Sequence, residues 1–164
     1  MRKQTAYDRL CKQTNQGWFS IATTVLRVGI GFVFLNAGLA KMTDWTAAGY
    51  LQGATGPLAE WFTSLAGNPL VDYLNIWGLT LIGLALVLGL LVRPASFFGI
   101  MIMVLYYLSD LEGNTAHGLV DEHIVYALIF VLFLSGGIGH VFGLDGLIFQ
   151  RMRKKRPWIR VLFG

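Results

Sequence analysis

The chain has 164 residues, of which 55% are hydrophobic and 13% are charged, and its net charge is +4. An average soluble domain carries roughly 25% charged residues, so this composition excludes an ordinary soluble domain and indicates a single membrane domain. The lone cysteine, Cys11, excludes a disulfide framework and a Cys-rich zinc or iron–sulfur site. Because the basic residues flank apolar segments, nucleic acid is not an expected partner.

Four apolar stretches are long enough to cross a bilayer, whose core of about 30 Å needs roughly 20 helical residues. In chain order they cover residues 18–40, 73–92, 94–111 and 122–142. Their apolar runs are continuous rather than alternating, which favours helices over strands. We therefore expect an all-α, integral membrane four-helix bundle over residues 18–147.

Charge is distributed unevenly between the two sides of these predicted spans. The segments on one side, which include both chain ends and Arg93, have a total net charge of +9, whereas the longer loops on the other side have −6. Arg27 lies inside the first span and is counted with neither side. Basic residues near span ends stay in the cytoplasm. The pattern predicts a plasma-membrane protein with a cytoplasmic N-terminal segment (1–17) and a basic cytoplasmic tail (148–164).

The segment between the first two spans reads WTAAGYLQGATGPLAEWFTSLAGNP. Gly and Pro interrupt its apolar residues too often for a span, so we expect one or two short helices in the outer interface. The tail, RMRKKRPWIRVLF, is either a surface anchor on anionic membrane lipids or an ordinary basic flank.

One face of the first span carries Arg27, Gly31, Phe34, Gly38 and Lys41 within about 40° of one line. Its glycines allow a neighbouring helix to approach closely, so this face is expected to point into the bundle. Arg27 lies about 14 Å into the span, where a charge costs at least about 2.5 kcal/mol. It is either part of a functional site or a structural arginine bonded to carbonyls or a tyrosine. Two further lines of small residues are predicted to be packing seams: Gly78, Ala85 and Gly89, and the pair Gly139 and Gly143.

The outer ends of the third and fourth spans carry the second group of candidate residues. Tyr107 lies one helical turn from Asp110, and His123 one turn from Tyr126, so each pair shares a face. Lys41 reaches the same level. The short connection brings the remaining polar residues together: Asp110, Glu112, His117, Asp121, Glu122 and His123. A metal site, a quinone-headgroup site and a solvated acidic loop all fit this composition, but no HxxxH or HExxH spacing favours the metal site.

Several cofactors are not expected in this chain. His123 and His140 lie 17 residues apart, about 25 Å along a helix, so they do not form a bis-histidine haem site. The sequence contains no phosphate loop and no nucleotide fingerprint, so neither a flavin nor a nucleotide site is indicated. Any redox role would therefore take electrons from a partner and pass them to a mobile carrier.

Three segments resemble the DoxX/DoxD family of membrane proteins. The first span, LRVGIGFVFLNAGLAKM, is similar to the family's opening pattern of an Arg, spaced glycines and a Gly-x-x-Lys close. GLTLIGLALVLGLLVRPAS resembles its Gly-rich second helix, and SGGIGHVFGLDGL its closing segment. The GxxxGLD spacing is closer to DoxD than to the shorter DoxX proteins. The resemblance covers roughly residues 18–147.

This resemblance implies a four-helix bundle in the plasma membrane. DoxD is similar to the membrane subunit of a thiosulfate:quinone oxidoreductase, which works with a second subunit called DoxA, and other DoxX proteins are membrane partners of redox-stress or respiratory systems. Many family members carry a glutamate in the second span, where this chain has residues 75–79 without a carboxylate. The family pattern falls here on Arg27, Gly38, Lys41, Gly89, Arg93 and Asp145.

The resulting expectation is a membrane subunit of a quinone-linked oxidoreductase that acts on a sulfur compound, with quinone as its cofactor. In this hypothesis, Arg27 anchors a quinone carbonyl or a ligand anion, and His123 with Glu122 or Asp121 handles protons. The other expected ligand-binding residues are Lys41, Tyr107, Asp110 and Tyr126, and no metal ligands are assigned. The alternative is a non-catalytic anchoring or assembly subunit of a larger respiratory or redox complex.

Overall fold

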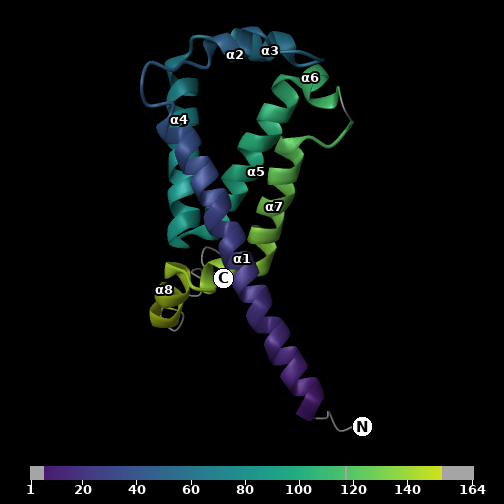
Figure 1. Cartoon of the computed structure of the whole chain (residues 1–164). Helices are drawn as coiled ribbons and strands as arrows, with labels where there is room; N and C mark the ends of the chain where they lie inside the picture. Colours follow the sequence, from purple (N-terminus) through teal and green to yellow (C-terminus); the bar gives the residue numbers. More distant parts are fainter. Residues whose placement is uncertain (1–5, 117, 153–164) are drawn as a thin grey trace.

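A computed structural model describes residues 6–116 and 118–152, with side chains described for residues 17–116 and 118–148. Every element of this part of the chain is helical, which confirms the all-α prediction (Figure 1). The long helices are α1 (Ala6–Leu39), α4 (Pro69–Leu88), α5 (Val92–Ser109) and α7 (Glu122–Gly136). The short ones are α2 (Ala48–Gln52), α3 (Ala59–Ser64), α6 (Leu111–Thr115), the 3-10 turn η1 (Ile138–His140) and α8 (Leu144–Met152).

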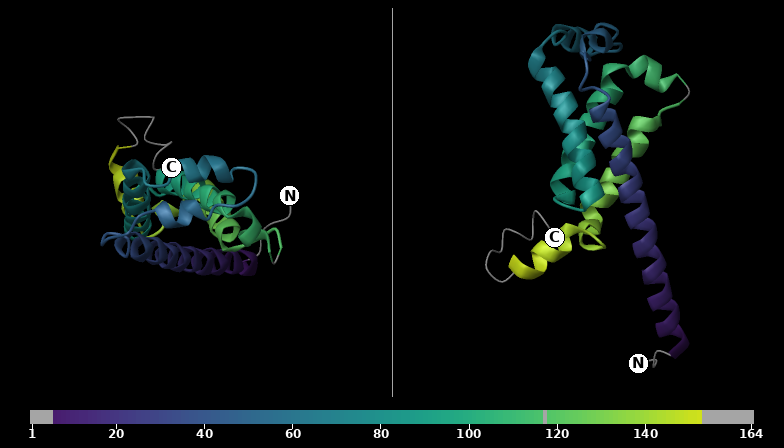
Figure 2. Two further views of the ribbon diagram at one scale, coloured as in Figure 1. Left: turned by 90° about the horizontal axis from the view of Figure 1, so that it is seen from above. Right: turned by 60° about the vertical axis from the view of Figure 1, so that its left-hand side comes forward.

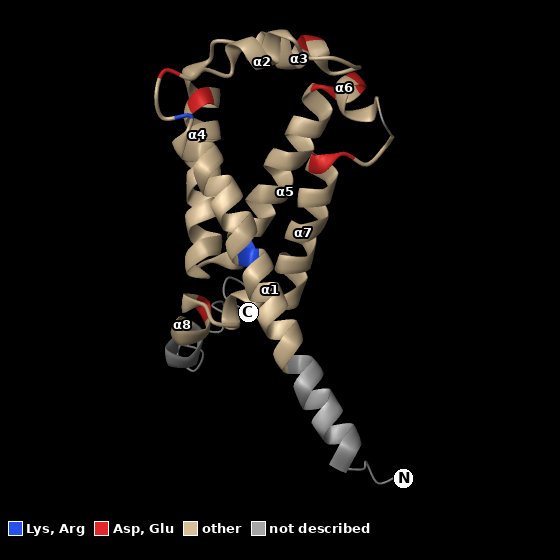
Figure 3. Ribbon diagram, in the orientation of Figure 1, with Lys and Arg blue, Asp and Glu red and all other residues tan. Residues whose placement is uncertain are grey.

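The long helices form two packed pairs, α1 with α4 and α5 with α7. The pairs approach each other near the start of α5 and diverge toward the opposite end, where α2 and α3 lie across the gap (Figures 1 and 2). Acidic residues gather at this covered end, in the segments around α3, α6 and the start of α7 (Figure 3). We call it the capped end, and the opposite end, where α4 turns into α5, the α8 end.

Glycines bring α1 and α4 into backbone contact, as the face of Gly31 and Gly38 predicts. A Cβ on Gly83 would lie 2.6 Å from the Leu35 Cα, and a Cβ on Gly38 would meet the backbone of Thr80. Small residues at such positions permit close van der Waals packing, which drives helix association in lipid. The α4 side of this seam is formed by Thr80 and Gly83 rather than by the predicted Gly78–Ala85–Gly89 line.

Aromatic side chains fill the space between the two helix pairs. Phe34 of α1 packs edge-on against Phe130 of α7, with ring centroids 5.0 Å apart. The Phe130 ring in turn lies over Gly99 of α5, where a Cβ would meet it at 2.6 Å. The buried core contains Ile30, Phe34, Leu79, Ile82, Leu86, Val92, Met103, Phe130, Phe133 and Ile138.

Local capping residues determine where α4 lies in the sequence. Asn68 accepts a hydrogen bond from the Leu70 N–H, Pro69 occupies the first helical position, and Gly89 ends the helix with φ of 63°. These are strong start and stop features. The helix therefore begins and ends four residues before the predicted boundaries of 73–92, which hydropathy alone had placed too late.

Three helices of the described chain are long and apolar enough to span a membrane: Gly17–Leu39, Pro69–Leu88 and Val92–Ser109. The predicted fourth span, 122–142, starts correctly at Glu122, after the N-cap Asp121. Its predicted end is wrong, because Gly137 adopts φ of 59° and stops the helix at Gly136. The remaining apolar residues form η1 and a non-helical stretch.

Candidate functional site

A cavity of about 560 Å³ lies at the capped end, beneath α2 and α3 and between the diverging helices. Buried apolar residues of the cap, including Leu51 and Phe62, form its cover. The side chains around it are mostly apolar and aromatic, with a few polar groups. They are Lys41, Trp45, Ala47, Tyr50, Leu51, Trp61, Phe62, Leu65, Val71, Leu74, Asn75, Ile102, Leu105, Tyr106, Ser109, Asp110, Asn114, Glu122 and His123.

The cap, formed by α2 and α3, is attached to the rest of the protein at two points. Before α2, the Ala47 N–H donates to Asp72 Oδ1 at 2.7 Å. Between α2 and α3, Thr55 Oγ1 donates to Asp110 Oδ1 at 2.8 Å and accepts from the Glu112 N–H at 3.0 Å. These bonds hold the cover in place over the cavity.

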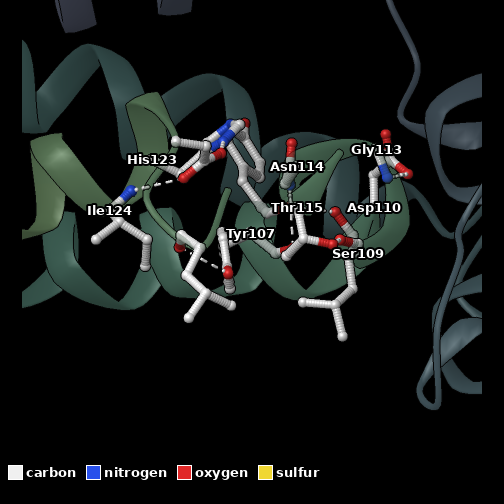
Figure 4. Close-up of polar contacts among 12 residues, drawn as sticks. Tyr107, Ser109, Asp110, Gly113, Asn114, Thr115, His123 and Ile124 are labelled. Atoms are coloured by element: carbon white, nitrogen blue, oxygen red, sulfur yellow. Dashed lines mark hydrogen bonds and ion pairs between the residues drawn. The ribbon is translucent and has the colours of Figure 1, made fainter. Parts of the chain in front are cut away.

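A polar cluster lines the cavity where α5 ends. The Tyr106 hydroxyl donates to Asn75 Oδ1, linking α5 to α4. Ser109 Oγ lies 2.9 Å from the Tyr50 hydroxyl, so the cluster also reaches α2. Asn114 donates to the carbonyls of Tyr106 at 3.3 Å and Tyr107 at 3.0 Å and thereby caps the last turn of α5 (Figure 4).

His123 enters the cavity from the first turn of α7. Its Nδ1 lies 2.5 Å from Asp121 Oδ2, while Asp121 Oδ1 accepts from the Ile124 N–H (Figure 4). Burial tends to raise the pKa of Asp121, but the hydrogen bonds from Ile124 and His123 and the charge of His123 outweigh it, so this pKa falls below its ordinary value. The result is an ionised carboxylate that orients one ring nitrogen of the histidine.

Two charged side chains complete the site. Lys41, just beyond α1, places its ammonium 4.8 Å from the centre of the Trp45 ring, within the range of a cation–π interaction. Glu122 lies beside His123 and is exposed. The cavity therefore combines flat aromatic walls with donors and an acid–base pair at its rim.

The structure brings together some of the sequence-predicted residues and separates others. Lys41, Asp110, Glu122 and His123 line the same cavity, and Asp121 contacts His123 from outside it. Tyr107 instead donates to the Leu119 carbonyl at 3.0 Å. Tyr126 packs against Phe34 in the core, with ring centroids 5.9 Å apart. His117 lies outside the described residues.

Arg27 lies at the α8 end, away from the cavity. It is only 1% exposed, and its guanidinium donates to three backbone carbonyls after α7. The distances are 3.2 Å to Ile138, 3.4 Å to Val141 and 3.2 Å to Phe142. Relative to the other helices, Arg27 is thus level with the end of α7 rather than with its middle. The contacts match the carbonyl-bonded alternative.

Asp145 is the acidic neighbour that sequence reasoning did not pair with Arg27. It is 1% exposed, accepts hydrogen bonds from the Leu91 and Val92 N–H groups, and interacts electrostatically with Arg27. The family pattern had marked both residues, but hydropathy placed Asp145 beyond the end of the fourth predicted span. Their joint match to the family pattern was the signal in the sequence that could have indicated this pair.

Asn75 and Tyr106 are the cavity residues that the analysis of the sequence missed as a pair. Neither was assigned to the candidate site from the sequence. Tyr106 and Tyr107 differ by about 100° around the helix, and composition does not show which of them faces a cavity. Within the described part of the chain, no group of three or more His, Cys, Asp or Glu residues could hold a metal ion.

Comparison with known proteins gives one match. The DoxX family model matches residues 22–109, more than half of the chain, including α1 from Ala22, the cap, α4 and α5. No curated protein and no solved structure matches the chain. The matched region contains the cap and most of the cavity lining, whereas His123 and Glu122 lie beyond it.

Proposed function

Because the chain belongs to the DoxX family of membrane proteins, we propose that it is the membrane subunit of a quinone-linked oxidoreductase. The quinone headgroup would bind beneath α2 and α3. The single observation that carries the proposal is the capped cavity, in which aromatic walls meet the His123–Asp121 pair.

The size and lining of the cavity suit this class of ligand. Small-molecule sites are concave, mostly apolar spaces of roughly 300–1,000 Å³ with a few convergent polar groups, and about 560 Å³ lies within that range. Tyr50, Trp45 and Trp61 offer flat surfaces to a ring. Exposed apolar residues of α4 and α5 beside the cavity, Leu74 and Leu105, would contact an isoprenoid tail in the surrounding lipid.

His123 is suited to proton transfer at the rim. Asp121 holds Nδ1, which leaves Nε2 to face a ligand oxygen. Exposed Glu122 beside it provides a connection to bulk water. Reduction of a quinone to a quinol consumes two electrons and two protons. The protons would pass through His123, and the electrons would come from a partner chain that oxidises a reduced sulfur compound.

The same proposal includes a four-span arrangement in the plasma membrane, with both termini in the cytoplasm. Helix α7 packs along α5, but its 15 residues cover only about 22 Å. Residues 137–142, which include the 3-10 turn η1, would complete the crossing. Arg27 supports this arrangement, because it donates to backbone carbonyls that a helix would otherwise have satisfied.

Two leucines on α4 provide a matched test of the cavity. Leu74 lines it, whereas Leu70, one turn earlier, does not, and the two are 63% and 62% exposed. We expect the purified protein in lipid nanodiscs to bind a decyl-substituted quinone, measured by calorimetric titration. Leu74→Trp should weaken binding at least tenfold, and Leu70→Trp less than twofold. Absence of binding to the unaltered protein, or equal binding by both variants, would contradict the proposal.

The second candidate function is the non-catalytic anchoring or assembly role. The favouring observation is α1, whose 34 residues extend about 51 Å and continue beyond the ends of the other long helices (Figure 1). A partner chain would pack on that extension. Native purification distinguishes the two roles: a stoichiometric complex without quinone at this chain favours assembly, and quinone retained by this chain favours the first.

A further inference from the structure

Within the proposed quinone-binding function, on which this step rests, we infer that Asn75 is the residue that binds a ligand carbonyl. Its amide Nδ2 donates to the carbonyl oxygen, and Tyr106 is a positioning residue that holds the amide in the required orientation. The ligand class is therefore a flat ring with two carbonyl oxygens, one for Asn75 and one for His123.

Asn75 can form more hydrogen bonds than the one that its oxygen accepts. Its side chain has one acceptor oxygen and an NH₂ group with two donors. The Tyr106 hydroxyl donates to that oxygen, which turns the oxygen toward α5. Among the described residues, none accepts a hydrogen bond from the Asn75 amide nitrogen. Asn75 is half-buried and lines the cavity, so its donors are available to a ligand there.

Tyr106 is held on several sides. Its ring packs edge-on against His123, with centroids 5.8 Å apart and an interplanar angle of 90°. On another side it meets the Tyr50 ring at 6.0 Å. Its backbone carbonyl accepts from Ser109 at 2.8 Å and from Asn114. A tyrosine with these contacts has little freedom to turn, so it fixes the amide to which it is bonded.

Removing water from a hydrogen-bond donor costs free energy unless another acceptor takes its place. A donor that faces an apolar cavity therefore favours ligands that supply an acceptor. Asn75 reaches the hydroxyl end of Tyr106 from α4, and His123 reaches its ring from α7. A ligand that lies against Tyr106 can therefore accept one hydrogen bond from Asn75 of α4 and one from His123 of α7. A ring with two carbonyls satisfies both, and a ring with one carbonyl leaves one unpaired.

Two matched ligands test the inference directly. One is a decyl-substituted 9,10-anthraquinone, and the other is the corresponding anthrone, a stable mono-ketone in which a CH₂ group replaces one carbonyl. We expect the unaltered protein to bind the diketone about five- to tenfold more tightly, which corresponds to one hydrogen bond. In Asn75→Leu, which keeps the approximate size of the side chain, the preference should fall to within twofold. A preference that survives in Asn75→Leu overturns the inference.

The ratio of the affinities for the diketone and the mono-ketone also tests the role of Tyr106. Tyr106→Phe removes the bond that orients the amide and should reduce the preference to about two- to threefold. Tyr107→Phe is the matched control, because its hydroxyl bonds to Leu119 and does not line the cavity. That variant should keep the full preference. If both variants behave alike, Tyr106 does not position Asn75.

These outcomes separate this inference from the proposed function. Failure of the unaltered protein to bind either ligand contradicts quinone binding itself. Tight binding of both ligands with equal affinity leaves quinone binding intact and overturns the assignment of Asn75. The ratio of the two affinities is also insensitive to partial unfolding, because a smaller folded fraction changes the measured binding of both ligands equally.

Discussion

Asp145 caps the first turn of α5 from 53 positions later in the chain, since its Oδ2 accepts a hydrogen bond from the Val92 N–H at 3.0 Å. Its other oxygen accepts from the Leu91 N–H at 2.7 Å. No side chain of α5 itself performs this role, and Leu91 has a φ of 53°. The contact therefore attaches the segment after α7 to the turn between α4 and α5.

Replacing Asp145 with Ala should destabilise the protein. The substitution leaves two N–H groups, of which that of Val92 is buried, without an acceptor and removes a carboxylate near Arg27, so we expect a loss of at least about 2 kcal/mol. Thermal unfolding in mild detergent at neutral pH measures it. Glu60→Ala, which removes an exposed carboxylate on α3, should change stability by less than about 0.5 kcal/mol. Equal effects would show that Asp145 is not a cap.

Arg27→Met should also lower stability, by about 3 kcal/mol, because it removes the donors of three carbonyls beside buried Asp145. The quinone affinity of the folded fraction should remain within twofold, since Arg27 lies at the opposite end from the cavity. Unfolding and ligand titration are measured on the same preparation. A large loss of affinity with unchanged stability would instead support Arg27 as a ligand-binding residue.

The seam between α1 and α4 predicts a difference between two glycines. Gly83→Ala places a methyl group against the Leu35 backbone and should cost about 1–3 kcal/mol. Gly29→Ala meets nothing within 4 Å and should be neutral or stabilising. Unfolding by denaturant in detergent compares the two. Equal stability of the variants would contradict the close backbone contact.

The lowered pKa of Asp121 predicts a pH dependence. A carboxyl whose folded-state pKa lies below its ordinary value of 3.8 stabilises the fold above that value, and the contribution disappears as pH falls through the folded pKa. Asp121→Asn should therefore be less stable than the unaltered protein at pH 6, and the difference should shrink below about pH 4. A difference that is independent of pH would contradict the lowered pKa of Asp121.

The hydrogen bonds of Thr55 are expected to contribute to the local stability of the cap. Thr55→Val removes the bond to Asp110 and the acceptor for the Glu112 N–H but keeps the shape of the side chain. We expect amide hydrogens of α2 to exchange about fivefold faster, which is one hydrogen bond of local stability. Thr43→Val, at an exposed position, serves as control. Unchanged exchange in Thr55→Val would show that the cap is held by apolar packing alone.

Much of the fold follows from local features of the sequence. Long apolar runs predict the membrane helices, Asn68–Pro69 and Asp121 are local start features, and glycines at regular spacing on α1 predict a packed face. The His123–Asp121 contact joins residues two positions apart, so its neighbourhood is apparent in the sequence. Helix ends were less accurate, because hydropathy does not register the glycines at positions 89 and 137.

The candidate site was predictable only in part. Lys41, Asp110, Glu122 and His123 all lie at the ends of apolar segments, and span ends on the same side of the membrane must lie near one another. Which tyrosine faces the cavity depends on the rotation of α5 against α4 and α7, which is set by contacts such as Gly99 with Phe130. The periodicity of α5 alone does not contain that information.

By itself, the sequence determined the class of this protein: an apolar helical membrane domain with acidic loops and basic chain ends, because hydropathy, capping and charge act over a few residues. Only the tertiary structure decided the hydrogen-bond partners of the buried polar residues. Arg27 donates to carbonyls 111 to 115 positions away, and Asn75 accepts from Tyr106 across 31 positions. Such pairs depend on how glycine seams orient whole helices, and that orientation is a property of the packed bundle.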